Sequence, residues 1–328
     1  MNLKKLFLAL SIFTLIFSPA FTDEVDQVEE EKSPWAFSIA TDFAFYPKSD
    51  YVAGGSHFAP ITGFYSGLEG RVTGNASYTI PTPLGDHWLL ASANLALKGS
   101  FELSPVSLKP GIEASFTPLP FLVFSAGAQA GSGWTLAGLQ GMAGFNGITA
   151  GTYTDYNFFQ TWYLKWYAQG TFQFDTGAIF PGDWTHFQIM YSYQLYYEKL
   201  SSAADGEIWM WQCTGNKVNG FKNYQNLILA YSMPLLVSRV GVLCELDGYY
   251  QNEAYTNPNY NGAFKTISIS PMAQFTFGPK DVLTVLLGFS SRRSFTTGHS
   301  QLYEETGLTY AGREWFFNRI ALSWTHSF

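Results

Sequence analysis

Apart from its N-terminal segment, the 328-residue sequence has no long hydrophobic run. A membrane-spanning helix needs about 20 consecutive apolar residues. The longest candidate, residues 227–243, is interrupted by Ser232, Pro234, Ser238 and Arg239. The sequence therefore excludes a bundle of transmembrane helices.

Charged residues are also scarce, at 13% of the sequence, and they form no basic patch. Because proteins that bind nucleic acid carry clustered Lys and Arg, no nucleic-acid partner is expected. The formal net charge of −7 is partly local, since six acids and one base fall within residues 23–32. We interpret residues 23–34 as an acidic, solvated lead.

The sequence has only two cysteines, Cys213 and Cys244. Cys213 falls in a long connection and Cys244 near the opposite end of an apolar strand face, so we predict that they do not pair. No histidine or second cysteine lies at ligand spacing from Cys213, so neither a metal nor a cofactor is expected. The five histidines match no catalytic pattern, and Asp183 and His186 fall on opposite strand faces near a turn. The sequence therefore does not predict an enzyme.

The first residues have the order of a secretory signal peptide. Two lysines precede an unbroken apolar run, residues 6–17, and small residues follow it. The run is too short to cross a bilayer as a helix. We therefore predict a signal peptide over residues 1–22, cleaved after Ala20 or Thr22, and an exported mature chain.

From residue 35 to the end, large apolar residues alternate with small or polar ones. Leu68 and Val72, for example, alternate with Glu69, Arg71 and Thr73. A period of two residues is typical of a strand with different environments on its two faces. The alternation predicts twelve strands, over residues 35–46, 64–80, 87–103, 106–116, 121–130, 158–175, 184–199, 224–237, 240–251, 263–277, 282–293 and 312–328.

The last predicted strand, GREWFFNRIALSWTHSF, ends on an aromatic residue. One face carries four large apolar side chains, Ile320, Leu322, Trp324 and Phe328. The alternation also places Phe316 on this face, and Phe317 with Arg319 on the other. This stretch resembles the C-terminal strand of bacterial outer-membrane β-barrel proteins, although His326 stands where an aromatic residue is more usual. The resemblance implies an outer-membrane location, surrounding membrane lipid, and recognition of the four apolar residues by the barrel-assembly machinery.

Further features favour a membrane barrel over a soluble fold with the same alternation. Aromatic residues make up 18% of the sequence, as girdles at two membrane interfaces would require. Long connections, such as residues 47–62, 131–157 and 200–223, mostly alternate with shorter ones, which is typical of extracellular loops and periplasmic turns. An even strand number puts both termini on the periplasmic side. We therefore predict an all-β fold: a single transmembrane antiparallel up-and-down β-barrel over residues 35–328, with about twelve strands and with ten or fourteen possible.

In such a barrel the polar set lines the lumen. The pore-lining candidates are Glu69, Arg71, Lys98, Lys165, Asp175, Glu245, Asp247, Arg292 and Arg319. Because they carry both signs, they indicate either cross-strand bracing or a narrow porin-like channel for passive diffusion of small solutes. The Gly-rich residues 131–151 could narrow the lumen or remain outside. The alternative is a surface adhesin or structural protein that uses the aromatic connection around Trp209 and Trp211.

Overall fold

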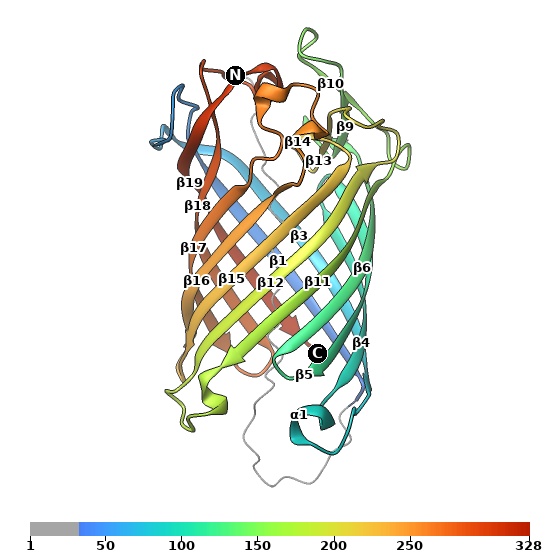
Figure 1. Ribbon diagram of the computed structural model, residues 1–328, viewed down its shortest axis with the longest axis vertical. Helices are drawn as coiled ribbons and strands as arrows, with labels where there is room; N and C mark the ends of the chain where they lie inside the picture. The colour runs from blue at the N-terminus through green and yellow to red at the C-terminus, as the bar shows by residue number, and fades with distance from the viewer. Residues whose placement is uncertain (1–32) are drawn as a thin grey trace.

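The computed structural model describes residues 33–328, and these form a closed barrel of twelve antiparallel strands (Figure 1). The predicted signal peptide and most of the acidic lead lie outside the described residues. In chain order the barrel strands are β1 (Trp35–Lys48), β3 (Gly63–Pro81), β4 (Asn94–Ser104), β5 (Ser107–Leu119), β6 (Leu122–Gly133), β11 (Tyr163–Asp175), β12 (Phe187–Leu200), β15 (Gly220–Ser232), β16 (Val237–Tyr249), β17 (Thr266–Phe277), β18 (Asp281–Phe295) and β19 (Tyr310–Ser327).

Pairing of the first and last strands closes the barrel. The register runs from Ser38 opposite Ser327 to Phe45 opposite Ile320. A short strand, β2 (His57–Phe58), adds to β19 in parallel beyond the point where β1 leaves it. The predicted fold class and strand number are confirmed, because every barrel strand has a hydrogen-bonded neighbour on each side.

The apolar face of the barrel points outward. Leu68, Trp166 and Leu287 are 41%, 44% and 42% exposed, whereas Asp42 and Glu198 are 5% and 1% exposed. A soluble barrel has the reverse arrangement, with apolar side chains inside. An apolar wall around a charged interior is the pattern of a barrel whose solvent is lipid.

Some element boundaries differ from the predicted ones. The turn between the eighth and ninth strands is residues 233–236, not Ser238 and Arg239, because Pro234 lacks the N–H that a strand needs. The third strand is shorter than predicted, since the short helix α1 (Trp88–Ala91) begins where His87 accepts a hydrogen bond from the backbone of Leu89. No helix among residues 33–328 is both long and apolar enough to cross a membrane.

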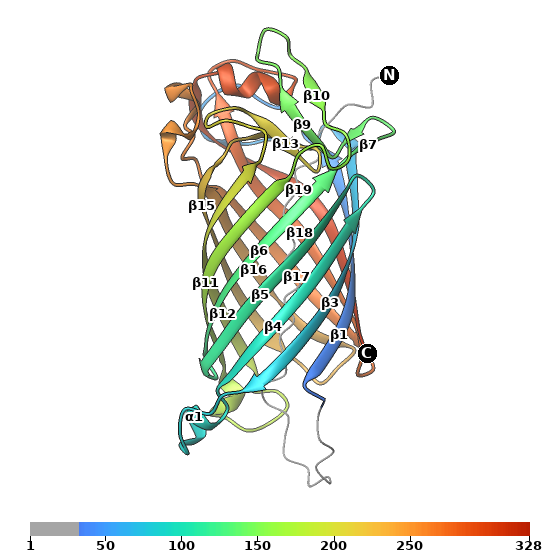
Figure 2. The same cartoon turned by 90° about the vertical axis from the view of Figure 1, so that its right-hand side faces the viewer.

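The connections differ between the two ends of the barrel (Figure 1, Figure 2). At one end, which we call the loop end, lie the long connections, residues 49–62, 134–162, 201–219, 250–265 and 296–309, together with the short turn 105–106. At the other end, the turn end, β1 begins and β19 finishes. Its connections are residues 82–93, which include α1, 120–121, 176–186, 233–236 and 278–280. The predicted asymmetry is present, and its one exception is again the third connection.

A β-bulge changes the faces of the last strand. Gly288 lies opposite Arg319 but Phe289 lies opposite Phe317, so Asn318 is an extra residue. Towards the loop end of this bulge the two faces of β19 exchange. Phe316 is therefore buried inside, while the Phe317 ring packs against Phe289 with ring centroids 5.2 Å apart. The predicted placement of Phe316 with Ile320 is wrong for this reason.

Candidate functional site: the barrel interior

A hairpin from the connection 201–219 folds into the loop end of the barrel. Its strands, β13 (Trp209–Trp211) and β14 (Thr214–Lys217), form a small sheet with β9 (Met142–Phe145) and β10 (Tyr153–Asp155) from the Gly-rich connection. Trp209 and Trp211 are 0% and 3% exposed, and the Trp211 ring stacks on Tyr163 of the wall at 4.5 Å. Gly131 permits this approach, since a Cβ there would lie 2.5 Å from the Trp211 ring. The two tryptophans are thus unavailable to a surface ligand.

The tip of the hairpin is fastened to the wall formed by β4 and β5. Gln212 and Cys213 both have positive φ, 48° and 61°, as a two-residue type I′ turn requires. Such turns favour Asn and Gly, so this tip is strained unless contacts hold it. The Gln212 side-chain amide donates to Glu102 at 2.8 Å and to the Ser107 hydroxyl at 2.9 Å. These contacts pin the hairpin across the lumen.

The second arm of the hairpin is held by a buried charge cluster. The Lys217 amine lies 3.1 Å from the Glu198 carboxylate, and the Lys222 amine lies 3.3 Å from Glu198 and 2.9 Å from Asp247. The hydroxyls of Tyr163 and Tyr249 also donate to Glu198, at 3.3 and 3.2 Å. Glu198 is therefore the central anion of the upper interior. Sequence reasoning missed Lys217 because its connection has no period that would place it inside.

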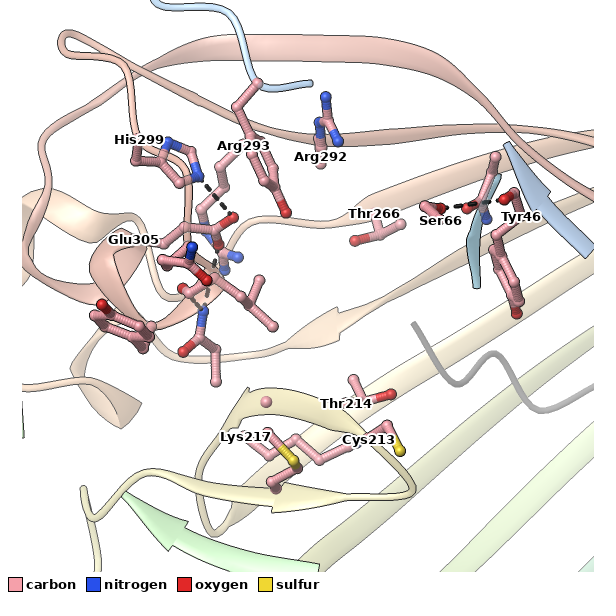
Figure 3. Close-up of a pocket in the computed structure, with 18 of the residues that line it drawn as sticks. Tyr46, Ser66, Cys213, Thr214, Lys217, Thr266, Arg292, Arg293, His299 and Glu305 are labelled. Atoms are coloured by element: carbon pink, nitrogen blue, oxygen red, sulfur yellow. Dashed lines mark hydrogen bonds and ion pairs between the residues drawn. The ribbon is translucent and has the colours of Figure 1, made fainter. Parts of the chain in front are cut away.

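A cavity of about 690 Å³ lies beside the hairpin at the loop end. One side of it is formed by Cys213 and Lys217 of the hairpin, and the other side by strand and loop residues that include Tyr46, Thr266 and His299 (Figure 3). The hairpin itself contacts β4 and β5 through Gln212, β6 and β11 through Trp211, and β12 through Lys217. The upper lumen is thus divided between a packed half and a hollow half.

Below the cavity, ion pairs cross neighbouring strands. The Arg71 guanidinium bonds the Asp42 carboxylate at 2.8 Å and lies 3.9 Å from Glu102, which also pairs with Lys109 at 3.0 Å. The Tyr46 hydroxyl donates to Glu69 at 2.7 Å. The structure therefore places Arg71 and Glu69 inside the barrel, where both have protein partners.

The other predicted lumen residues are spread over the height of the barrel. Lys98 lies opposite Glu113 in the ladder, and the Lys165 amine lies 4.1 Å from the Tyr196 ring centroid. Arg319 approaches Glu245 at 4.0 Å. Lys98 and Arg319 belong to the middle of the barrel, whereas Lys165 lies opposite Glu198 in the upper interior.

Two of the predicted residues belong to the rims. Asp175 caps the short helix η1 (Thr176–Ala178) at the turn end and lies 3.0 Å from the His186 ring nitrogen. Arg292 pairs with Glu314 near the loop end, between the rings of Tyr51 and Phe316 at 4.0 and 4.4 Å. Both residues brace connections.

Several buried polar atoms in the middle of the barrel have no hydrogen-bond partner within the described residues. They are one carboxylate oxygen of Glu245, one terminal nitrogen of Arg319, and the side-chain oxygens of Gln194 and Asn226. Burying such groups without a hydrogen bond is costly, and in proteins they are commonly satisfied by water. The middle of the lumen is therefore polar, and its side chains pack closely around these atoms.

An apolar band also lines half of the inner wall. Met190, Ile228, Leu243, Leu286 and Ala321 form one buried cluster across β12, β15, β16, β18 and β19. Their side chains are 0–9% exposed, so the interior is packed at this level.

The anchoring of the connection 49–62 should depend on pH. The hydrogen bond from the His57 ring to the Gly55 carbonyl, helped by Glu314 at 2.8 Å, raises the pKa of His57. The folded protein holds this proton more tightly than the unfolded chain does. The stabilisation that protonated His57 gives to this connection is therefore complete below the ordinary pKa of about 6.5, and it is lost as pH rises through the raised pKa. Hydrogen exchange at the Gly54 and Ala59 amides should thus be faster at about pH 8.5 than at about pH 5.5, after correction for intrinsic rates. In His57→Gln this difference should vanish, and a difference that persists would contradict the assignment.

No protein family model matches the chain, and no curated protein matches it. Among solved structures, the chain is similar to an outer membrane channel from Pseudomonas putida F1, with 12% identity over 93% of this chain and 100% of that one and a TM-score of 0.44. It is also similar to the β domain of the Bordetella autotransporter BrkA, with 11% identity over 89% of this chain and 99% of that one and a TM-score of 0.40. The fold type follows from the closed ladder, the apolar outer wall and the charged interior alone. The chain is a twelve-stranded β-barrel of the bacterial outer-membrane type.

Proposed function

We propose that the protein is a narrow channel that lets small polar solutes cross the outer membrane by passive diffusion. The observation that carries the proposal is the set of buried polar atoms that have no hydrogen-bond partner in the middle of the barrel. Asn318 and Asp247 line the cavity, and Arg319 and Glu245 follow them along their strands towards the turn end. A barrel that served only as a scaffold would gain by pairing these atoms or replacing them with apolar groups.

The proposal includes an orientation and a route of assembly. The loop end would face outward and both strand termini the periplasm, as in barrels with long external loops. Ile320, Leu322 and Trp324 on the outer face of β19, and Phe328 directly after it, are 37–67% exposed, and the barrel-assembly machinery could bind them there. The acidic lead would then lie in the periplasm.

Planar-bilayer recording tests the channel. The purified barrel should give small, steady current steps carried by both anions and cations, since the interior holds charges of both signs. If the purified barrel carried no current at any voltage, the channel proposal would be wrong and a structural role would be favoured.

Cys213 provides a site-specific probe within the same recordings. Its burial raises the pKa of the thiol to about 12, so the reactive thiolate at neutral pH should be about 1,000-fold scarcer than for an ordinary cysteine. A thiosulfonate reagent should therefore react slowly at neutral pH, faster in alkali, and then reduce the current. Cys213→Ser should conduct but lose this block, whereas Cys244, on the outward face of β16, should make no contribution.

A further inference from the structure

Two arginines lie directly opposite each other near the loop end of the wall. The ladder between β18 and β19 pairs Arg293 with Arg313. Like charges in directly opposed positions destabilise a sheet. The next rung shows the usual solution, because there Arg292 faces Glu314 and forms an ion pair with it. The Arg293–Arg313 pair therefore requires an explanation.

Neither guanidinium has a carboxylate within 4.0 Å among residues 33–328. Arg293 donates only to neutral oxygens, namely the carbonyls of Asn261 and Gly262 and the Tyr260 hydroxyl. Arg313 donates to the Ser291 hydroxyl. The Phe264 ring is shared by the two cations, with its centroid 5.0 Å from Arg293 and 4.3 Å from Arg313. No carboxylate among the described residues therefore neutralises the pair.

By strand alternation both arginines belong to the outward face of the wall, at the rim where Arg293 also borders the cavity. Along β18, Arg293 is in phase with Leu287 and Phe289, which are 42% and 36% exposed. Along β19, Arg313 is in phase with Phe317, the outward partner of Phe289. Aromatic side chains on this face mark a membrane interface. The arginines lie four residues further towards the loop end, which is about 13 Å along a strand and therefore at headgroup level.

We infer that Arg293 and Arg313 form a binding site for the phosphate group of an anionic lipid in the leaflet at the loop end. Guanidinium groups bind phosphate through paired, charge-assisted hydrogen bonds. An anion bridging the two would replace their repulsion by two attractions, which explains why the like-charged rung exists. The site goes beyond the proposed channel and does not depend on whether the barrel conducts.

Native mass spectrometry of the full-length protein, delipidated in a neutral detergent, tests this site. The probes are phosphatidic acid and diacylglycerol with the same acyl chains. Wild type should retain phosphatidic acid and release diacylglycerol. Arg293→Gln and Arg313→Gln should each weaken retention by about tenfold. The matched control is Lys199→Gln, which removes a single outward cation near the loop end of β12 and should leave retention unchanged.

Stability measurements distinguish loss of a ligand site from loss of folding. In neutral detergent without anionic lipid, Arg313→Gln should melt at or above the wild-type temperature, because it removes a like-charge contact. Added phosphatidic acid should then stabilise wild type but not the variant. Equal retention by wild type and both variants would overturn the inference. Inorganic phosphate binding as tightly as the lipid would also overturn it, since Arg293 borders the cavity and the site would then serve a soluble anion.

Discussion

Glu198→Gln should destabilise the barrel by about 3–5 kcal/mol, the usual effect of removing one partner from a buried ion pair. The glutamine would leave Lys217 without a carboxylate and Lys222 with Asp247 alone. Burial already lowers the pKa of Lys217, and Glu198 is the main group that opposes this shift. Thermal unfolding, followed by the heat-dependent change in gel mobility of the barrel, measures the loss.

The pH dependence of this loss of stability should identify the unpaired Lys217 as its cause. The unfolded chain would hold the Lys217 proton more tightly than the folded variant, so the defect should shrink as pH rises towards the ordinary lysine pKa. Adding Lys217→Met to Glu198→Gln should restore much of the stability. The matched control, Glu253→Gln, changes an exposed acid in the connection 250–265 and should have little effect. A Glu198→Gln barrel that melts with wild type would show that the cluster does not hold the hairpin.

Replacing residues 209–217 by a short Gly-Ser linker should raise the single-channel conductance severalfold. The hairpin fills the half of the upper lumen that faces β4, β5, β6, β11 and β12, and it is not part of the twelve-strand ladder. Its removal should therefore open the lumen without breaking the barrel, which the gel-mobility assay can verify. The measurement is conductance in planar bilayers under identical salt.

The matched control for this excision is a Gly-Ser replacement of residues 148–150. These form an exposed tip of the same small sheet and should leave the conductance unchanged. If the excised barrel conducted no better than wild type, the limiting constriction would lie lower, at the level of Arg71 and Arg319. The prediction about the hairpin would then be wrong.

The period of two residues determined most of the wall. Lipid contacts every outward position, so strands such as residues 64–80 and 282–293 had to alternate, and their faces could be assigned before any pairing was known. The same local signal gave the number of strands and the uneven connections. It failed at Pro234, where turn chemistry overrode an apolar run that continued past the end of the strand.

The contents of the barrel were decided only by the tertiary structure. The connection around Trp209 and Trp211 has no period, so its position depends on distant partners such as Glu102 and Glu198. The bulge at Asn318, likewise, depends on how β18 and β19 pair, and it moves Phe316 to the inside. An alternating pattern records only which neighbour, lipid or lumen, each strand face meets. Which side chains meet across the lumen, and whether Arg293 faces Arg313, depends on register and closure between segments far apart in the chain.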